Sequence, residues 1–207
     1  FELPGKRYVM LTEAALYNYS GMRFRAMGNR GLEVNYTEHD GFTVEGKLIT
    51  PWRVLLYADN LNSLVNNTMI NDLNPQPDPQ LYGDKSYIKP GRAVWSWITR
   101  GENYMNPEEE IKFINAAAQL NFEYTMLDEG WETKWPDKWK QLRQICNFAA
   151  GKKVGVWVWK NSKELRNPLK RDAFLDSAHA AGVVGIKTDF MDSEAKELIV
   201  FEIEFLK

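Results

Sequence analysis

The sequence predicts an α/β fold whose second half resembles the first half of a (β/α)₈ TIM-type barrel. Apolar, β-prone runs begin at Ala93, Tyr124, Val154 and Val184, about every 30 residues, which is the size of a βα unit. A helical pattern follows each run. The runs are almost continuously apolar, as is typical of the buried strands of a parallel sheet.

The helices between these strands have recognisable ends. Helical patterns cover residues 107–120, 137–150 and 168–181, and a further helix starts from Ser193. Pro107 stands at a helix start and is followed by three glutamates, which suits the helix dipole. Gly151 and Gly182 follow the second and third helices, where glycine commonly ends a helix.

Four consecutive βα units fit either half of a barrel or an open doubly wound sheet. The first strand-to-helix turn lacks a Gly-x-Gly-x-x-Gly motif, which argues against a dinucleotide-binding sheet. The aromatic and acidic residues at the strand ends favour the barrel.

The first half of the chain has a different pattern. Short β-prone runs at residues 8–16, 22–26, 32–37 and 52–58 are separated by turn signals at 28–31 and 40–41, which indicates antiparallel sheet. We therefore expect the end of a β-domain at residues 1–60, a linker rich in Asn, Pro and Asp at 61–90, and four βα units at 91–207. Because neither half completes a domain, we expect an internal segment of a larger enzyme.

Composition excludes several classes of function. The 207 residues carry a net charge of −2, so there is no electrostatic case for nucleic-acid binding. No apolar run approaches the 18 residues of a membrane span, and no signal peptide is visible at the first residue. The common nucleophile, zinc-protease, P-loop and Cys-x-x-Cys motifs are absent. Nothing in the sequence predicts the oligomeric state.

The strand ends carry the candidate chemistry. The most informative run is 184–191 (VGIKTDFM), in which Lys187 and Asp189 are two residues apart and so point the same way. Barrel enzymes keep catalytic groups at the carboxyl ends of their strands, where side chains from different strands converge. The other strand ends supply Trp95, Trp97, Asp128, Glu129, Trp131, Trp157, Trp159 and Lys160.

Each of these candidates also has a structural interpretation. Lys187 and Asp189 could form an ion pair that only stabilises a strand end, and Asp128 could cap the turn that follows it. Asp192 and Glu194 are expected to cap and charge the start of the last helix. The chain contains eight tryptophans, most of which we expect in the core. Those at the strand ends are a weak signal for carbohydrate, because aromatic faces stack on sugar rings.

The strongest signal is a set of runs that resemble one family. Residues 84–97 (DKSYIKPGRAVWSW), 122–131 (FEYTMLDEGW) and 185–192 (GIKTDFMD) resemble the start of the barrel of glycoside hydrolase family 97. Residues 11–22 (LTEAALYNYSGM) and 50–56 (TPWRVLL) resemble the end of its amino-terminal β-sandwich. The runs occur in family order and cover nearly the whole chain. Tyr87 stands where a tryptophan is common.

The resemblance implies an enzyme that hydrolyses terminal α-glycosidic bonds, α-galactosides above all, by a retaining double displacement. Asp189 stands at the position of the nucleophile in the retaining members. Lys187 would keep Asp189 ionised and contact the sugar. The other expected substrate-binding residues are Asp128, Trp97, Trp131 and Trp159, and the expected partner is an oligosaccharide.

The resemblance also implies a calcium ion near the sugar, with Glu13 matching a carboxylate ligand from the sandwich. The general acid and the other calcium ligands of the family would follow Lys207, so we expect the isolated chain to be inactive. The family also implies a periplasmic or secreted protein.

Three alternatives stay open. The enzyme could be an inverting α-glucosidase of the same family, or the chain could be a carbohydrate-binding fragment without catalytic activity. A metal-dependent sugar isomerase is the third, but its usual set of His and Glu ligands is not found here: the only two histidines, His39 and His179, lack partners at metal-site spacing.

Overall fold

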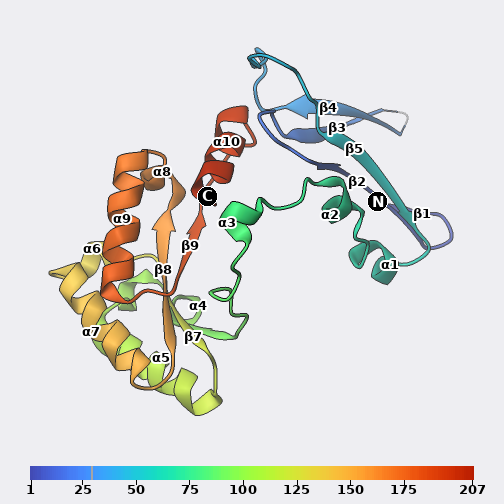
Figure 1. Ribbon diagram of the computed structural model, residues 1–207. Coiled ribbons are helices and arrows are strands. Elements are labelled where there is room, and N and C mark those ends of the chain that lie inside the picture. The colour runs from blue at the N-terminus through green and yellow to red at the C-terminus, as the bar shows by residue number, and fades with distance from the viewer. Residues whose placement is uncertain (29) are drawn as a thin grey trace. The chain divides into compact units, whose positions relative to one another are not determined.

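The computed structural model describes residues 1–28 and 30–207; Asn29, in the expected turn at 28–31, lies outside the described residues. Figure 1 shows the chain, which divides into two compact units. Unit 1 comprises residues 1–85 and 191–207, and unit 2 comprises residues 86–190. Each unit is described by itself.

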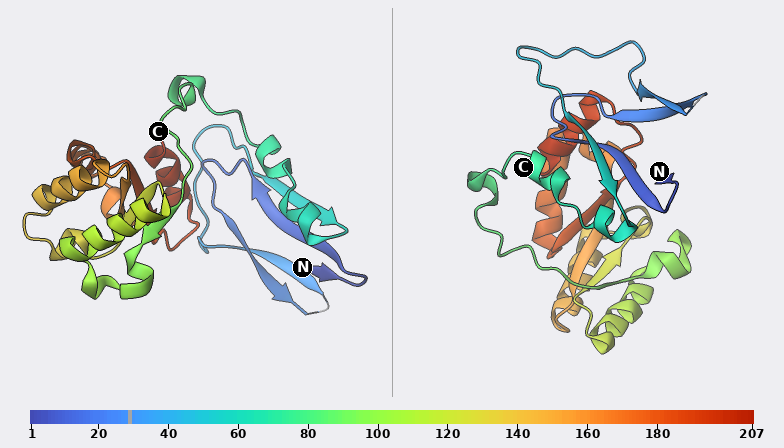
Figure 2. Two further views of the ribbon diagram at one scale, coloured as in Figure 1. Left: turned by 90° about the horizontal axis from the view of Figure 1, so that it is seen from below. Right: turned by 90° about the vertical axis from the view of Figure 1, so that its right-hand side faces the viewer.

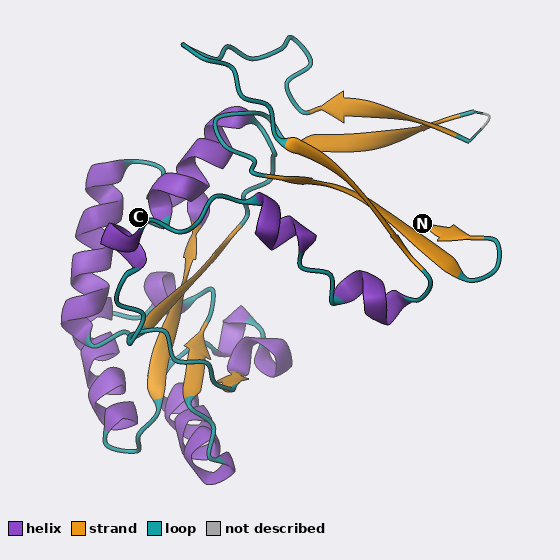
Figure 3. Ribbon diagram, turned by 45° about the vertical axis from the view of Figure 1, so that its right-hand side comes forward, coloured by secondary structure: helices purple, strands orange, loops and turns teal. Residues whose placement is uncertain are grey.

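Unit 1 is built on antiparallel sheet, as the sequence predicts. The strands β1 (Glu2–Leu3), β2 (Arg7–Ala14) and β5 (Trp52–Ala58) pair in the order β1-β2-β5. A separate hairpin pairs β3 (Met22–Met27) with β4 (Gly31–Tyr36), and both sheets are visible in Figure 3. In β5, alternate side chains are buried, as expected for a sheet with one covered face.

The segment expected as a linker contains three short helices: α1 (Leu61–Val65), α2 (Met69–Leu73) and α3 (Pro79–Tyr82). Two polar side chains cap these helices: Asn60, just before the segment, accepts a hydrogen bond from the first turn of α1, and Asp78, within it, accepts one from the first turn of α3. Residues from α1 and α2 cover a core in the β2–β5 sheet; its members are Ala14, Val54 and Leu56, with Met10, Leu64, Ile70 and Leu73 around them. The expected domain limits stay a prediction.

The last helix, α10 (Lys196–Phe205), begins three residues later than expected, and Ala195 occupies its N-cap position. Glu194 therefore does not cap it. Instead, the Glu194 carboxylate accepts hydrogen bonds from Arg23 and Thr37, and its backbone carbonyl accepts one from the Gly21 N–H at 2.8 Å. These long-range bonds hold the start of α10 on the hairpin of unit 1.

Unit 2 is a parallel sheet with helices, which confirms the α/β prediction. The strands β6 (Ala93–Trp95), β7 (Tyr124–Leu127), β8 (Gly155–Asn161) and β9 (Gly185–Asp189) pair in sequence order. The long helices are α5 (Pro107–Leu120), α7 (Lys138–Ala150) and α9 (Pro168–Ala181). Shorter elements follow strand ends or connect to the long helices: α4 (Ser96–Arg100), η1 (Glu102–Tyr104), α6 (Trp131–Lys134) and α8 (Ser162–Leu165).

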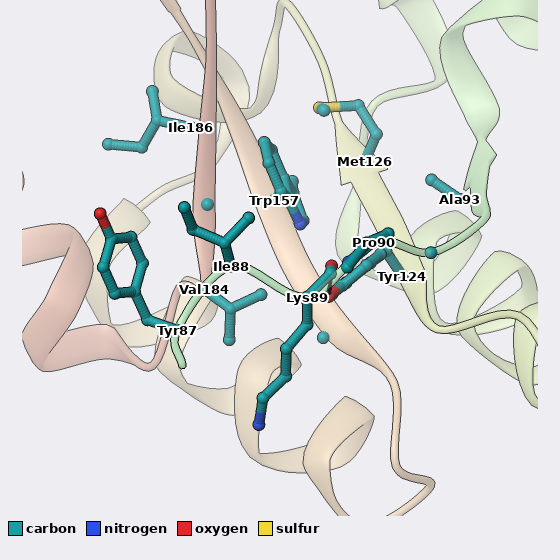
Figure 4. Close-up of a pocket in the computed structure, with 13 residues that line it drawn as sticks. Tyr87, Ile88, Lys89, Pro90, Ala93, Tyr124, Met126, Trp157, Val184 and Ile186 are labelled. Carbon is teal, nitrogen blue, oxygen red and sulfur yellow. Dashed lines mark hydrogen bonds between the residues drawn. The ribbon is translucent and has the colours of Figure 1, made fainter. Parts of the chain in front are cut away.

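The two faces of the parallel sheet differ. Alternate residues that point towards the helices are almost fully buried: Thr125, Leu127, Val156 and Val158. Figure 2 shows unit 2 from two further sides. On the other face a hollow of about 950 Å³ is lined by residues that include the first residue of every strand, and Figure 4 shows its apolar side chains. Gly185 is needed there, because a Cβ atom would lie 2.4 Å from the Trp157 ring.

The first strand of unit 2 is shorter than expected because the chain turns into α4 at Ser96. The Ser96 hydroxyl donates a 2.7 Å hydrogen bond to Oε1 of Glu110 in the first turn of α5. From the sequence, Glu110 was expected to interact with the helix dipole together with Glu108 and Glu109. In the structure its side chain is completely buried. Burial raises the pKa of Glu110 to about 7, although the bond from Ser96 opposes this.

This buried carboxyl predicts a pH-dependent stability. Between about pH 4.5 and 7 the unfolded chain releases the Glu110 proton while the folded chain keeps it, so the free energy of unfolding falls as pH rises through that window. Glu110→Gln keeps a partner for Ser96 and carries no charge. We expect it to be more stable than the wild type at pH 8 by up to about 3 kcal/mol and equally stable near pH 4.5.

The measurement is urea unfolding of the full-length protein at pH 4.5, 6 and 8. The exposed neighbour Glu108→Gln is the matched control and should keep the wild-type slope. An unchanged slope in Glu110→Gln would mean that Glu110 is ionised in the folded protein.

None of the helices within residues 1–28 and 30–207 is both long and apolar enough to cross a membrane.

Candidate active site

Strand register brings the candidate residues of unit 2 together. The β8–β9 pairing sets Trp159 beside Lys187 and Asn161 beside Asp189. Because side chains alternate along a strand, Trp159, Lys187 and Asp189 share the face opposite the helices. They lie at the carboxyl ends of their strands, whereas the hollow of Figure 4 lies towards the amino ends. We take the carboxyl ends as the candidate site because charged groups converge there.

Lys187 is the centre of this cluster. Its ammonium lies 3.0 Å from Oδ2 of Asp128, at the end of β7, and 2.9 Å from Oδ2 of Asp189. Partial burial would lower the pKa of Lys187, but the hydrogen bonds with Asp189 and Asp128 outweigh it and raise that pKa above the ordinary value. The ammonium is therefore charged at neutral pH and compensates two carboxylates.

The two aspartates are held differently. The Asp128 side chain is 5% exposed, and its other oxygen accepts a 2.7 Å hydrogen bond from the Glu129 N–H. Asp189 is 40% exposed, and its Oδ1 accepts a 3.0 Å hydrogen bond from the indole N–H of Trp159. Asp189 is thus an oriented carboxylate that a ligand can reach, which a nucleophile or base requires.

Two tryptophans, Trp95 at the end of β6 and Trp97 in α4, lie next to the cluster. The Lys187 ammonium lies 4.9 Å from the centre of the Trp95 ring. The Trp97 ring stacks on the Trp95 ring, with 6.2 Å between their centres and an angle of 23° between their planes. Trp97, expected at a strand end, is instead in α4 and is 37% exposed. Sequence reasoning noted Trp95 but did not choose it. Its place as the last residue of β6 was the available signal.

Trp131 was expected to contact substrate, but the structure gives it a different position. Its side chain has no exposed surface, and its indole N–H donates a 2.9 Å hydrogen bond to the backbone carbonyl of Trp159. Its ring packs edge-on against Trp135 and Trp139. Trp131 therefore contacts the backbone of β8 and has no exposed surface for a substrate.

Glu13, the expected calcium ligand, lies in unit 1. Its carboxylate pairs with the guanidinium of Arg53, and its Oε2 accepts a 2.8 Å hydrogen bond from the Met22 N–H. Arg53 also donates to the Tyr36 hydroxyl at 2.8 Å. No group of three or more His, Cys, Asp or Glu side chains that could hold a metal occurs within residues 1–28 and 30–207. These residues do not form a calcium site by themselves.

Family models match both parts of the chain. The model described as glycosyl-hydrolase 97 N-terminal matches residues 1–75. The model described as glycoside hydrolase 97 matches residues 87–207, which is more than half of the chain. The chain belongs to glycoside hydrolase family 97. This confirms the resemblance that the sequence runs indicated.

Two curated relatives of this family 97 chain are both named as retaining α-galactosidases. The chain is 31% identical over 175 residues to a "Probable retaining alpha-galactosidase" of Streptomyces bingchenggensis, covering 79% of the chain and 27% of that protein. It is 27% identical over 233 residues to a "Retaining alpha-galactosidase" of Bacteroides thetaiotaomicron, covering 93% and 34%. The chain thus spans about a third of these relatives or less.

Solved structures show the same fold. A β-arabinopyranosidase superimposes with a TM-score of 0.79 at 23% identity, over 95% of this chain and 34% of that one. A family 97 enzyme of Pseudoalteromonas sp. strain K8, in complex with acarbose, gives 0.77 at 18% identity, over 99% and 38%. At these identities the comparison establishes the fold alone.

Proposed function

We propose that the full-length protein hydrolyses terminal α-galactosidic bonds with retention of configuration, and that Asp189 is the nucleophile. One observation carries the proposal: Asp189 is a partly exposed carboxylate at the end of β9 with both oxygens held, one by Lys187 and one by Trp159. The names of the two curated relatives support the galactoside and the retaining mechanism.

In the first step, one carboxylate oxygen of Asp189 forms a bond to the anomeric carbon while the bond from that carbon to the leaving oxygen breaks. Water then cleaves the glycosyl ester and regenerates the carboxylate. Lys187 holds Oδ2 of Asp189 through its ammonium, 2.9 Å away, and presents an N–H to a sugar hydroxyl. A second carboxyl group must protonate the leaving oxygen. Asp128 is buried against Lys187, so we assign that role to the rest of the protein.

We also propose that unit 2 is the first half of a (β/α)₈ barrel and that unit 1 contains the last strands of a β-sandwich. The four parallel strands in sequence order support the first proposal, as does the hollow on the face opposite the helices. In a closed barrel, side chains of the remaining strands would fill that face.

Covalent trapping tests the assignment of the nucleophile. An activated fluorogalactoside, whose fluorine slows breakdown of the intermediate, should add one sugar to the full-length protein, and mass spectrometry of its peptides should place the sugar on Asp189. A sugar on another residue would remove Asp189 from the mechanism. Binding without a covalent product would favour the inverting enzyme or the binding fragment.

A calcium ion is a separate proposal, to which this chain would contribute Glu13. Carboxylate oxygen suits calcium, but the ion would have to replace Arg53 as the partner of Glu13. We expect calcium to raise the melting temperature of the full-length protein and Glu13→Gln to reduce that rise. Glu33→Gln, at a glutamate paired with Arg25 on the neighbouring hairpin, is the control. An equal rise in Glu13→Gln would exclude Glu13 as a ligand.

An oligosaccharide is the proposed partner, and the periplasm or the exterior of the cell is the proposed location. Both follow from the family. Cell fractionation with an antibody tests the location, and retention in the cytoplasmic fraction would contradict it.

A further inference from the structure

Trp159 has less surface for a sugar than its place at a strand end suggests. Its side chain is 9% exposed, and its ring meets the Phe190 ring edge-on at 6.0 Å. Its one polar atom, the indole N–H, donates to Oδ1 of Asp189 at 3.0 Å. The contact of Trp159 that bears on chemistry is therefore with the carboxylate.

Two consecutive residues of β8, Trp159 and Lys160, make polar contacts with α6. The Trp131 indole donates to the carbonyl of Trp159 at 2.9 Å. The ammonium of the next residue, Lys160, lies 2.6 Å from the carboxylate of Glu132, which follows Trp131. Trp131 and Lys160 are 0% and 5% exposed, so both bonds are shielded from water and favour a single geometry.

The end of β9 is fixed as well. Phe190 directly follows Asp189 with φ of 64°, a conformation that side chains other than glycine rarely adopt. Its carbonyl accepts a 3.0 Å hydrogen bond from the buried Ser162 hydroxyl at the start of α8. Asp189 is therefore located by its backbone and by donors to both carboxylate oxygens.

We propose that Trp159 and Trp131 are positioning residues: the Trp159 indole fixes the rotation of the Asp189 carboxylate, and Trp131 holds Trp159 in place. This inference rests on the proposed role of Asp189 as nucleophile. Without the indole N–H, Lys187 would hold only Oδ2, and the carboxylate could turn about that contact. A turned carboxylate reaches the anomeric carbon less often, which lowers the rate of the chemical step more than substrate binding.

The test replaces Trp159 in the full-length protein with phenylalanine and, separately, with 3-benzothienylalanine, in which sulfur replaces the N–H and ring size is kept. Steady-state kinetics on an aryl α-galactoside give kcat and KM separately. Both variants should lose about 10-fold in kcat and keep KM within about 2-fold. The benzothienyl variant separates the missing hydrogen bond from any loss of packing.

Trp131→Phe should also lower kcat, but only by about 3-fold, and should keep KM within about 2-fold. Trp135→Phe is the matched control, because Trp135 is also buried, packs on Trp131 and donates its indole N–H to a backbone carbonyl, that of Met105 at 3.0 Å. Trp135→Phe should lose comparable stability and keep the wild-type kcat.

The inference is overturned if the benzothienyl variant keeps the wild-type kcat, or if only KM rises, which would indicate stacking on the sugar. It is also overturned for Trp131 if Trp131→Phe and Trp135→Phe behave alike. Failure of the proposed function looks different: Asp189→Ala would then retain activity, whatever the tryptophan variants do.

Discussion

Replacing Asp189 with alanine is expected to lower kcat on an aryl α-galactoside by about 10⁴-fold or more, because the substitution removes the group proposed to form the bond to the anomeric carbon. Protein folding should change little, since the Asp189 side chain is 40% exposed. Steady-state kinetics of the full-length variant, with a melting curve, measure both quantities. Asp176→Ala, at an exposed aspartate on α9, is the matched control and should keep wild-type kinetics.

Azide should partly restore turnover in Asp189→Ala. The small anion can occupy the space left by the carboxylate and attack the same face of the sugar. Its nitrogen then bonds to the anomeric carbon as the aryl oxygen leaves, which gives the β-galactosyl azide. Formation of the α-azide, or the absence of any azide product, would show that Asp189 does not occupy the position of the nucleophile.

Replacing Lys187 with methionine is expected to reduce both activity and stability. The substitution removes the cation beside Asp189 and leaves Asp128, whose side chain is 5% exposed, as an uncompensated buried carboxylate. We expect a loss of about 2–3 kcal/mol in the free energy of unfolding, less than for a fully buried pair because Lys187 is 30% exposed. We expect kcat/KM to fall by about 10²-fold or more.

A second substitution separates the two effects of Lys187. Adding Asp128→Asn to Lys187→Met removes the unpaired negative charge of Asp128. Much of the free energy of unfolding should then be restored, as urea unfolding can measure. Activity should stay low, because Asp189 still lacks its cation. Recovery of kcat/KM together with stability would mean that Lys187 serves folding alone.

Local signals in the sequence were sufficient for much of unit 2. The helices Pro107–Leu120 and Pro168–Ala181 have the predicted bounds, because each begins with a proline behind an asparagine cap and ends at a left-handed Asn or Gly. The spacing of two between Lys187 and Asp189 also fixed their common face. These predictions depend only on residues a few positions apart.

What the sequence did not show depends on distant partners. The burial of Glu110 follows from its contact with Ser96, 14 residues earlier. Trp131 was expected to contact substrate, and only the position of α6 beside the end of β8 shows that its indole N–H donates to the Trp159 carbonyl. Glu13 matched a calcium ligand by motif, yet its position opposite Arg53 depends on the β2–β5 register.

The stereochemistry of hydrolysis tests the central claim most directly. Proton NMR of the full-length protein acting on an aryl α-galactoside, recorded before mutarotation is complete, identifies the first-formed anomer of the released sugar. A double displacement through Asp189 predicts that α-galactose appears first and the β-anomer follows as mutarotation proceeds. If β-galactose appears first, the enzyme inverts configuration, and Asp189 is not its nucleophile.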